Sequence, residues 1–286
     1  KELLLHGTLE GLPDVDDSVS NSIVQFETNM RFSHNDLTYS FVSECGEEKI
    51  GKMKEAFEII ERRTELISFK ETKKEDSDIL ISCSNERITK DGHVFITGEG
   101  GPSKFLNLSL YPLIIQGEIM LYEDLYKSRR DVRCEEPIVE VHELMHVFGY
   151  DHVDNKSSIL YPYFSCEQEL GQDFVDDIID LYSIEPKAEI YFENVSAVKS
   201  GPYLNFNVSI PNHGLILAGD VSLRVYAEGK EQKFFELNDI KPGVITSFNI
   251  ENLHLPSRNT EEIEFRLISD TREYDLNNNV VKLVLE

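Results

Sequence analysis

The sequence predicts an α+β domain, built on a twisted mixed sheet of five strands with three helices, followed by an all-β sandwich. A strand–helix–strand–strand pattern near the start of the chain supports the first prediction. A change to strict apolar–polar alternation after residue 188 supports the second. We therefore expect one domain over residues 1–185, opening with an irregular acidic segment over 1–30, and a second over 186–286.

The first domain should contain the elements of the mixed sheet. Apolar residues recur every three or four positions over 48–64, which predicts an amphipathic helix with its apolar stripe on the core. Three glycines and Pro102 predict a loop over 98–102. Strands are expected at 37–42, 67–69, 78–82, 105–110 and 117–121, with helices at 48–64, 137–148 and 173–182.

The second domain has the pattern of a series of short strands. Residues 203–209 and 221–226 alternate between apolar and polar side chains, as expected for strands with one buried face. Turn signals occur at 212–214, 228–230 and 241–243. About seven short strands in a hundred residues predict an antiparallel sandwich.

The chain is strongly acidic, with a net charge of −25. Residues 1–185 hold 38 of the 53 acidic and 18 of the 28 basic residues, or about −20 of that charge. This negative charge repels nucleic acid and so disfavours it as a partner. The acidic residues either form a solvated surface or steer basic substrates to the protein. No run of eighteen apolar residues occurs, so no membrane span is expected. The chain begins without Met or a signal peptide, so we expect upstream residues to have been removed.

The four cysteines are not arranged as zinc ligands, because no CxxC pair occurs and none lies near the histidine-rich segment. An even number indicates either two disulfides in an exported protein or four buried thiols. We favour disulfides, and with them an extracellular or cell-surface location.

The segment that carries chemistry contains His142, Glu143, His146, Gly149 and His152. Two histidines four residues apart on a helix project from one face, so both imidazoles can reach one ion. Gly149 lets the chain leave the helix in a left-handed conformation and bring round a third ligand, His152. Glu143 is then placed as the general base, acting on a water at the open fourth position of one catalytic Zn²⁺.

Chance occurrence and a structural metal site account for this pattern less well. A lone histidine is usually a surface or core residue, and a glycine after a helix is often only a stop signal, but here they occur together at fixed spacing. A purely structural zinc site would normally close with a fourth protein ligand, and none is evident in this segment.

This HExxHxxGxxH pattern resembles that of the metzincins, and residues 30–185 resemble their matrixin branch. The likeness extends to Asp151 before His152, and to the segments 29–32, 37–39, 77–81 and 170–178. The resemblance implies a metzincin-type catalytic domain: a zinc metalloendopeptidase that hydrolyses extended polypeptides. It also implies that substrate pairs with an edge strand around 105–110, which includes Leu108. The S1′ pocket would be bounded by Ile138 on the active-site helix and by Pro162, Tyr163 and Phe164, favouring an apolar P1′ residue.

The chain departs from the matrixin pattern in several places. Leu160 stands where the family has the methionine of the turn beneath the zinc, a change of similar volume that should cost at most about 1.5 kcal/mol. The positions of the structural-zinc histidines hold Asn107 and Met120, and only His93 remains nearby. We therefore expect a single zinc ion. No calcium site is assigned, although the acidic pair at 123–124 would suit one. The inhibitory cysteine is missing too, and Asp14 is the one candidate for a substitute ligand.

The sheet order implied by this resemblance also predicts the disulfides. Its first and third strands are parallel neighbours, so Cys45 and Cys83 should meet just past their ends. Cys134 precedes the active-site helix and Cys166 ends the predicted pocket wall, so a bridge there would clamp the wall to the helix.

The second domain resembles the CARDB adhesion-related, immunoglobulin-like sandwich in its Asn/Gly-rich motifs at 212–214, 242–243 and 275–279. The resemblance implies tethering to a surface or protein, and we expect a monomer. Two alternatives to an endopeptidase remain: a weakly active zinc-binding adhesion protein, which retention of Glu143 disfavours, and an aminopeptidase of related motif.

Overall fold

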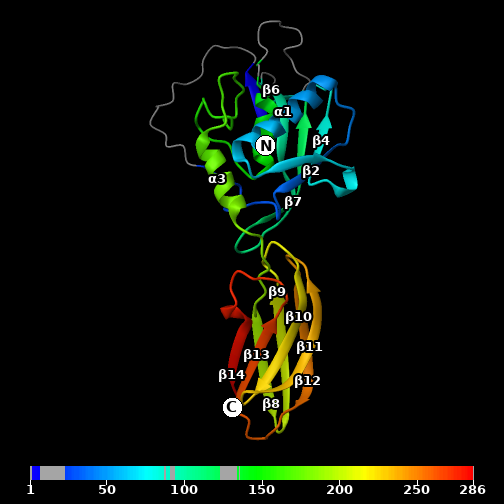
Figure 1. Cartoon of the computed structure of the whole chain (residues 1–286), viewed down its shortest axis with the longest axis vertical. Coiled ribbons are helices and arrows are strands. Elements are labelled where there is room, and N and C mark those ends of the chain that lie inside the picture. Colours follow the sequence, from blue (N-terminus) through cyan, green and yellow to red (C-terminus); the bar gives the residue numbers. More distant parts are fainter. Residues whose placement is uncertain are drawn as a thin grey trace. The chain divides into compact units, whose positions relative to one another are not determined.

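The computed structural model describes residues 2–6, 23–86, 88–90, 94–122, 134 and 136–285. The chain forms two compact units, whose elements are labelled in Figure 1. The first comprises Lys1–Phe105 and Pro112–Ile184, and the second comprises Leu106–Tyr111 and Glu185–Glu286. Asp14, His93 and the acidic pair at 123–124 lie outside the described residues.

The first unit is organised around a mixed sheet. Its strands are β1 (Glu2–His6), β2 (Asp36–Phe41), β3 (Ser68–Glu71), β4 (Ile79–Cys83), β5 (Ile88–Lys90), β6 (Val94–Leu106) and β7 (Leu113–Leu121). They follow the order β1-β6-β7-β4-β2-β3, and β5 also pairs with β6. Strand β2 is parallel to β3 and β4, and β4 is parallel to β7. The predicted mixed sheet is confirmed, with β1 and β5 added to β6 as short antiparallel strands.

Three helices accompany this sheet: α1 (Glu47–Thr64), α2 (Ile138–Val147) and α3 (Gln172–Ser183), with a 3₁₀ turn, η1, at Lys74–Asp76. Helix α1 has acidic residues in its first turn and basic residues in its last, which complements the helix dipole. It buries Met53, Phe57 and Ile60 of the predicted stripe, whereas Ile50, the first member of that stripe, is half-buried. Every residue of α2 is buried except Val139. Such a helix offers its functional groups a site largely shielded from water.

Two predictions about strand β6 are wrong. The glycines at 98–101 were expected in a loop, yet they lie inside this strand. The strand expected at 105–110 ends at Leu106, and the segment Leu106–Tyr111 belongs to the second compact unit. There Ser109 contacts His213 at 2.9 Å, and the ring of Tyr111 lies against that of Tyr274. The alternation of this segment therefore reflects packing outside the sheet.

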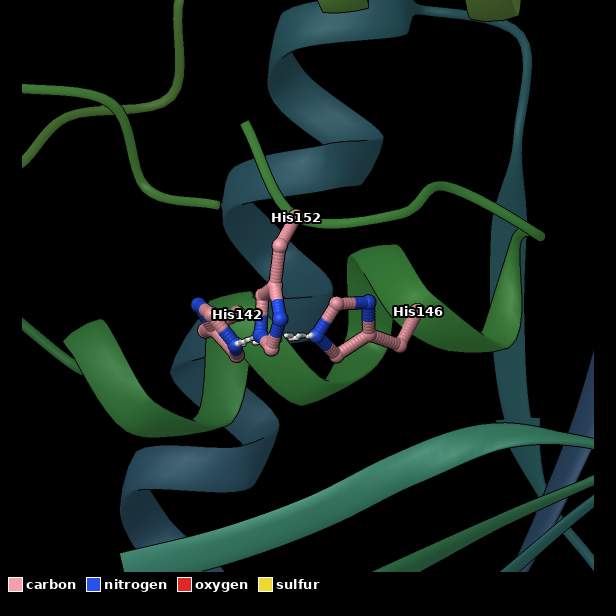
Figure 2. Close-up of side chains that lie close together, drawn as sticks. All are labelled: His142, His146 and His152. Carbon is pink, nitrogen blue, oxygen red and sulfur yellow. Dashed lines mark hydrogen bonds between the residues drawn. The ribbon is translucent and has the colours of Figure 1, made fainter. Parts of the chain in front are cut away.

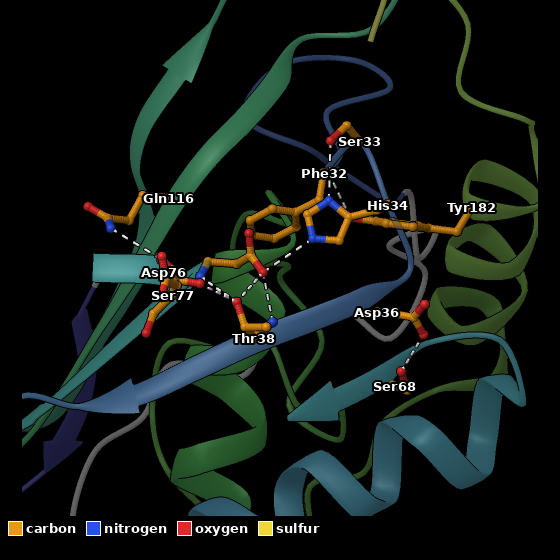
Figure 3. Close-up of polar contacts among 11 residues, drawn as sticks. Phe32, Ser33, His34, Asp36, Thr38, Ser68, Asp76, Ser77, Gln116 and Tyr182 are labelled. Carbon is orange, nitrogen blue, oxygen red and sulfur yellow. Dashed lines mark hydrogen bonds and ion pairs between the residues drawn. The ribbon is translucent and has the colours of Figure 1, made fainter. Parts of the chain in front are cut away.

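A polar cluster joins the starts of β2 and β4 (Figure 3). Asp78 accepts hydrogen bonds from the backbone N–H of Thr38 at 2.7 Å and from its hydroxyl at 2.6 Å. His34 Nε2 lies 3.2 Å from the same carboxylate oxygen. The hydrogen bond to Asp78 raises the pKa of His34. Burial alone would raise the pKa of Asp78, but the hydrogen bonds from His34 and Thr38 outweigh it and lower that pKa.

Replacing Asp78 with Asn should therefore destabilise the chain most at mildly acidic pH. The charge of Asp78 stabilises the fold above its ordinary pKa of 3.8 and loses this effect as pH falls through its lowered folded pKa. The charge of His34 stabilises the fold below the ordinary histidine pKa of 6.5. This effect is lost as pH rises through the raised pKa of His34 in the folded chain. The His34 side chain is 45% exposed, so we expect at most about 1 kcal/mol.

Urea unfolding of the parent chain and of Asp78→Asn from pH 3 to 9 measures the difference between their free energies of unfolding. It should peak between about pH 4 and 6.5, and His34→Gln should remove its decline at higher pH. A difference that does not vary with pH would contradict the assignment.

Two disulfides join segments far apart in sequence, and they are the predicted pairs: Cys45 with Cys83 and Cys134 with Cys166. The first follows from the parallel pairing of β2 with β4. The partners are 38 and 32 positions apart in the sequence, so each bridge should stabilise the fold by about 3–4 kcal/mol in the chain-entropy model.

The second unit is a sandwich of two antiparallel sheets. Its strands are β8 (Asn194–Ser200), β9 (Tyr203–Pro211), β10 (Ala218–Ala227), β11 (Lys230–Ile240), β12 (Ile245–His254), β13 (Glu262–Ile268) and β14 (Val280–Val284), with a 3₁₀ turn, η3, at Asn277–Asn279. One sheet has the order β11-β10-β13-β14 and the other β12-β9-β8. Alternate residues of β9, β10 and β13 fill a shared apolar core. Among the described residues, no helix is both long and apolar enough to cross a membrane.

Candidate active site

Three imidazoles converge on one point (Figure 2). His142 and His146 project from α2, and His152 comes from the loop that follows. The Nε2 atoms of His142 and His146 are 2.9 Å apart, and each lies 3.2 Å from Nε2 of His152. These are close to the separations expected of three ligands arranged tetrahedrally around Zn²⁺ at about 2.0–2.1 Å.

The hydrogen bonds of the Nδ1 atoms of His142 and His146 fix the orientation and the tautomer of these two rings. His142 Nδ1 lies 2.5 Å from the carbonyl of Ile159, and His146 Nδ1 lies 2.7 Å from that of Tyr150. A carbonyl can only accept, so Nδ1 carries the proton and each Nε2 presents a lone pair to the centre. Burial lowers the pKa of His142 to about 3 and that of His146 well below its ordinary value, so both rings are neutral. Lone pairs that face one another without protons require a cation, and the histidine set fits Zn²⁺.

Glu143 is buried and follows the first histidine on α2. Neither carboxylate oxygen has a hydrogen-bond partner among the described residues. Burial raises the pKa of this carboxyl well above its ordinary value, and a cation held by the histidines would lower it again. A buried carboxylate without a partner is costly to keep unless its function uses it.

Strand β6 passes very close to this carboxylate, and only glycine fits there. A Cβ on Gly98 would lie 2.5 Å from Glu143 Oε1, and one on Gly100 would lie 2.4 Å from the backbone oxygen of the same residue. Sequence reasoning missed this function of the glycines, because glycine is also the commonest signal for a loop. The pattern Gly-x-Gly in a strand, a sign of close backbone approach, could have indicated it.

Two short segments adjoin the helical histidines: the loop after α2 and the turn that contains Leu160. Gly149 has φ +91, and a Cβ there would press on the side chain of Met30. This left-handed residue ends the helix and sends the chain toward His152. Leu160 is fully buried in a turn in which Tyr161 N–H donates to the carbonyl of Ser158. The neighbouring residue of the same turn, Ile159, supplies the carbonyl that orients His142.

The predicted substrate-contacting residues fall into two groups. Ile138 is the first residue of α2, and the segment that holds Pro162, Tyr163 and Phe164 is partly exposed. The Cys134–Cys166 bridge ties the chain just before α2 to the end of that segment. Leu108, by contrast, is buried in the second compact unit and lies outside every strand. The prediction that it lies on the substrate-binding edge strand is therefore wrong.

Comparison with known proteins identifies the first unit. The matrixin peptidase family model matches residues 31–183, more than half of the 286 residues. Among solved structures, the chain is similar to a CARDB domain from Pyrococcus furiosus that was solved in complex with di-metal ions. The sequence identity is 19%, the TM-score is 0.26, and the alignment covers 35% of this chain and 90% of that one. A search of curated proteins found no match.

The family match spans strands β2 to β7, the three helices and the three convergent histidines. The arrangement of these histidines is suited to one Zn²⁺ ion. The chain therefore belongs to the matrixin family of zinc metallopeptidases.

Proposed function

We propose that the chain is a zinc-dependent endopeptidase that cleaves extended polypeptides, with His142, His146 and His152 as the metal ligands and Glu143 as the general base. One observation carries the proposal: three imidazole nitrogens converge, and the residue after His142 is a buried glutamate whose carboxylate has no hydrogen-bond partner among the described residues. Zinc bound there would polarise both a water molecule and the scissile carbonyl.

Residues of the chain would carry out the proton transfers, orient the metal ligands and exclude water. Glu143 takes a proton as the water oxygen attacks the carbonyl carbon of the scissile bond. It then delivers that proton to the leaving amine nitrogen as the C–N bond breaks. The carbonyls of Ile159 and Tyr150 keep two of the imidazoles oriented throughout. Burial of α2 limits the access of other water to the reaction.

Substrate binding would use strand β6 and the segment after the turn. An extended peptide can hydrogen-bond to a strand edge through its backbone, which accepts many sequences and favours internal cleavage. The part of β6 that passes Glu143 is Gly98–Gly100, so we place the substrate there. Side-chain preference would arise between Ile138 and the residues Pro162, Tyr163 and Phe164, with an apolar residue at P1′.

We further propose that residues 1–185 form the peptidase domain, that residues 186–286 serve as an accessory domain, and that the protein works outside the cell. Two disulfides support export, because they persist in oxidising compartments.

Digestion of an N-terminally acetylated peptide library, read by mass spectrometry, tests the endopeptidase assignment. We expect internal cuts before apolar residues, which a zinc chelator abolishes. An aminopeptidase needs a free amino terminus, so it would leave acetylated peptides intact and shorten unblocked ones by single residues. That second result would contradict the proposal.

A further inference from the structure

A groove of about 820 Å³ extends over the face of the mixed sheet that points away from α2. Strand β7 defines this face. A Cβ on Gly117 would lie 2.5 Å from the side chain of Val147 in α2, so the next residue, Glu118, points to the opposite side of the sheet. In the paired register, Leu80 of β4 lies opposite Glu118. Both residues line the groove, and so does Met120, two residues further along β7.

The groove also follows strand β6 and comes close to Glu143. Gly100 lines it, and a Cβ on Gly100 would lie 2.4 Å from the backbone oxygen of Glu143. Its lining on β6 extends from Glu99 to Phe105, which corresponds to roughly 20 Å of strand at about 3.3 Å per residue. The groove can therefore accept an extended segment of about six residues next to the proposed reaction centre.

Apolar side chains line much of the groove and stay open to solvent. Leu80 and Met120 are half-buried, and Phe105 is 46% exposed. Apolar surface that a folded chain leaves exposed in a concave place is typical of binding sites. The volume also falls within the range of ligand-binding clefts, roughly 300–1,000 Å³.

The charged groups of the lining are mostly acidic. They are the carboxylates of Glu27, Glu99 and Glu118 and the ammonium group of Lys74. Among the described residues, none of the three carboxylates takes part in an ion pair. They are not close enough together to hold one metal ion, because the histidine set is the only such group in the described part of the chain. The groove therefore combines separate, unneutralised negative charges with apolar surface.

We propose that this groove is an accessory site for the polypeptide substrate, and that it binds a segment containing both basic and apolar side chains. The proposal rests on the endopeptidase function proposed above and names its substrate class. Lysine or arginine side chains complement the three carboxylates, and apolar side chains cover Leu80, Met120 and Phe105. The same charges repel nucleic acid and anionic membranes, and a net charge of −25 disfavours a second copy of the chain.

Binding of a synthetic peptide to the zinc-loaded, full-length chain tests this site. The probe is a fluorescent, acetylated hexapeptide of alternating lysine and leucine, followed by anisotropy. Every chain carries Glu143→Gln, so the probe is not cleaved. One variant neutralises the groove with Glu27→Gln and Glu118→Gln. The control makes the same change at Glu55 and Glu58, two exposed glutamates of α1 outside the groove. Both variants lose two negative charges and differ only in where they lose them.

We expect the groove variant to bind the probe about three- to tenfold more weakly than the parent at low ionic strength, because two exposed ion pairs are lost. The α1 control should bind nearly like the parent. Met120→Ser, which removes apolar surface without changing charge, should also weaken binding severalfold.

Equal losses in the groove variant and the α1 control would mean that net charge alone attracts the probe. Unchanged binding in the groove variant would place the probe elsewhere. Either result, or no binding to the parent, would overturn the proposal. No cleavage is measured, so these outcomes are independent of the endopeptidase assignment, which the acetylated library tests with Glu143 intact.

Discussion

Glu143→Gln is expected to lower kcat/KM for an internally cleaved peptide by about 10²- to 10⁴-fold, the range typical of a lost general base. The variant should keep the zinc content of the parent, because Glu143 moves protons and is not one of the three converging ligands. Gln has nearly the same shape, so it can occupy the space beneath Gly98 without a new clash. The amide is not basic, and this loss accounts for the whole effect.

Zinc content by mass spectrometry and cleavage rate are measured on the same sample. Glu140→Gln is a matched control: it makes the same change at a buried glutamate three residues earlier on α2, and it should keep most of the activity. Loss of most zinc in Glu143→Gln, or cleavage close to that of the parent, would contradict the role assigned to this residue.

His152→Ala should lose both metal affinity and activity. His142 and His146 remain on α2, but two ligands hold Zn²⁺ much more weakly than three. We expect zinc affinity to fall by more than the roughly 10- to 100-fold typical of a lost outer-shell partner. The fold should persist, because two disulfides hold this unit together independently of the metal.

Competition with a chromophoric chelator gives the affinity, and the unfolding midpoint shows whether the fold is intact. The control is His254→Ala, which removes an exposed histidine of β12 in the sandwich and should change neither zinc affinity nor cleavage. If His152→Ala bound zinc as tightly as the parent, His152 would not be a ligand.

The convergence of the three histidines could be predicted well, because the residues that produce it are close together in the sequence. His142 and His146 share a helix face through their spacing, and Gly149 turns the chain toward His152 within three residues. The disulfide pairs could not be predicted from local sequence alone, because their prediction rested on the strand order of the family that the chain resembles. That order was correct, with β2 parallel to β4.

Strand β6 was predicted poorly because tertiary contacts decide its conformation. Gly98 and Gly100 have glycine's usual signal for a loop, but they lie in a strand. Glycine is needed at these strand positions because Glu143 leaves no room for a side chain. The segment 105–110 alternates like a strand, yet most of it packs in the second compact unit. Strand β1 contains three consecutive leucines without alternation, so no periodicity distinguished it from an irregular segment.

Titration of Zn²⁺ into the metal-free chain, with cleavage of an acetylated peptide measured at each step, tests the central claim most directly. If His142, His146 and His152 hold one catalytic ion, activity should rise linearly and stop rising at one equivalent, with no cleavage in its absence. Full activity without zinc, or a requirement for two equivalents, would contradict this account.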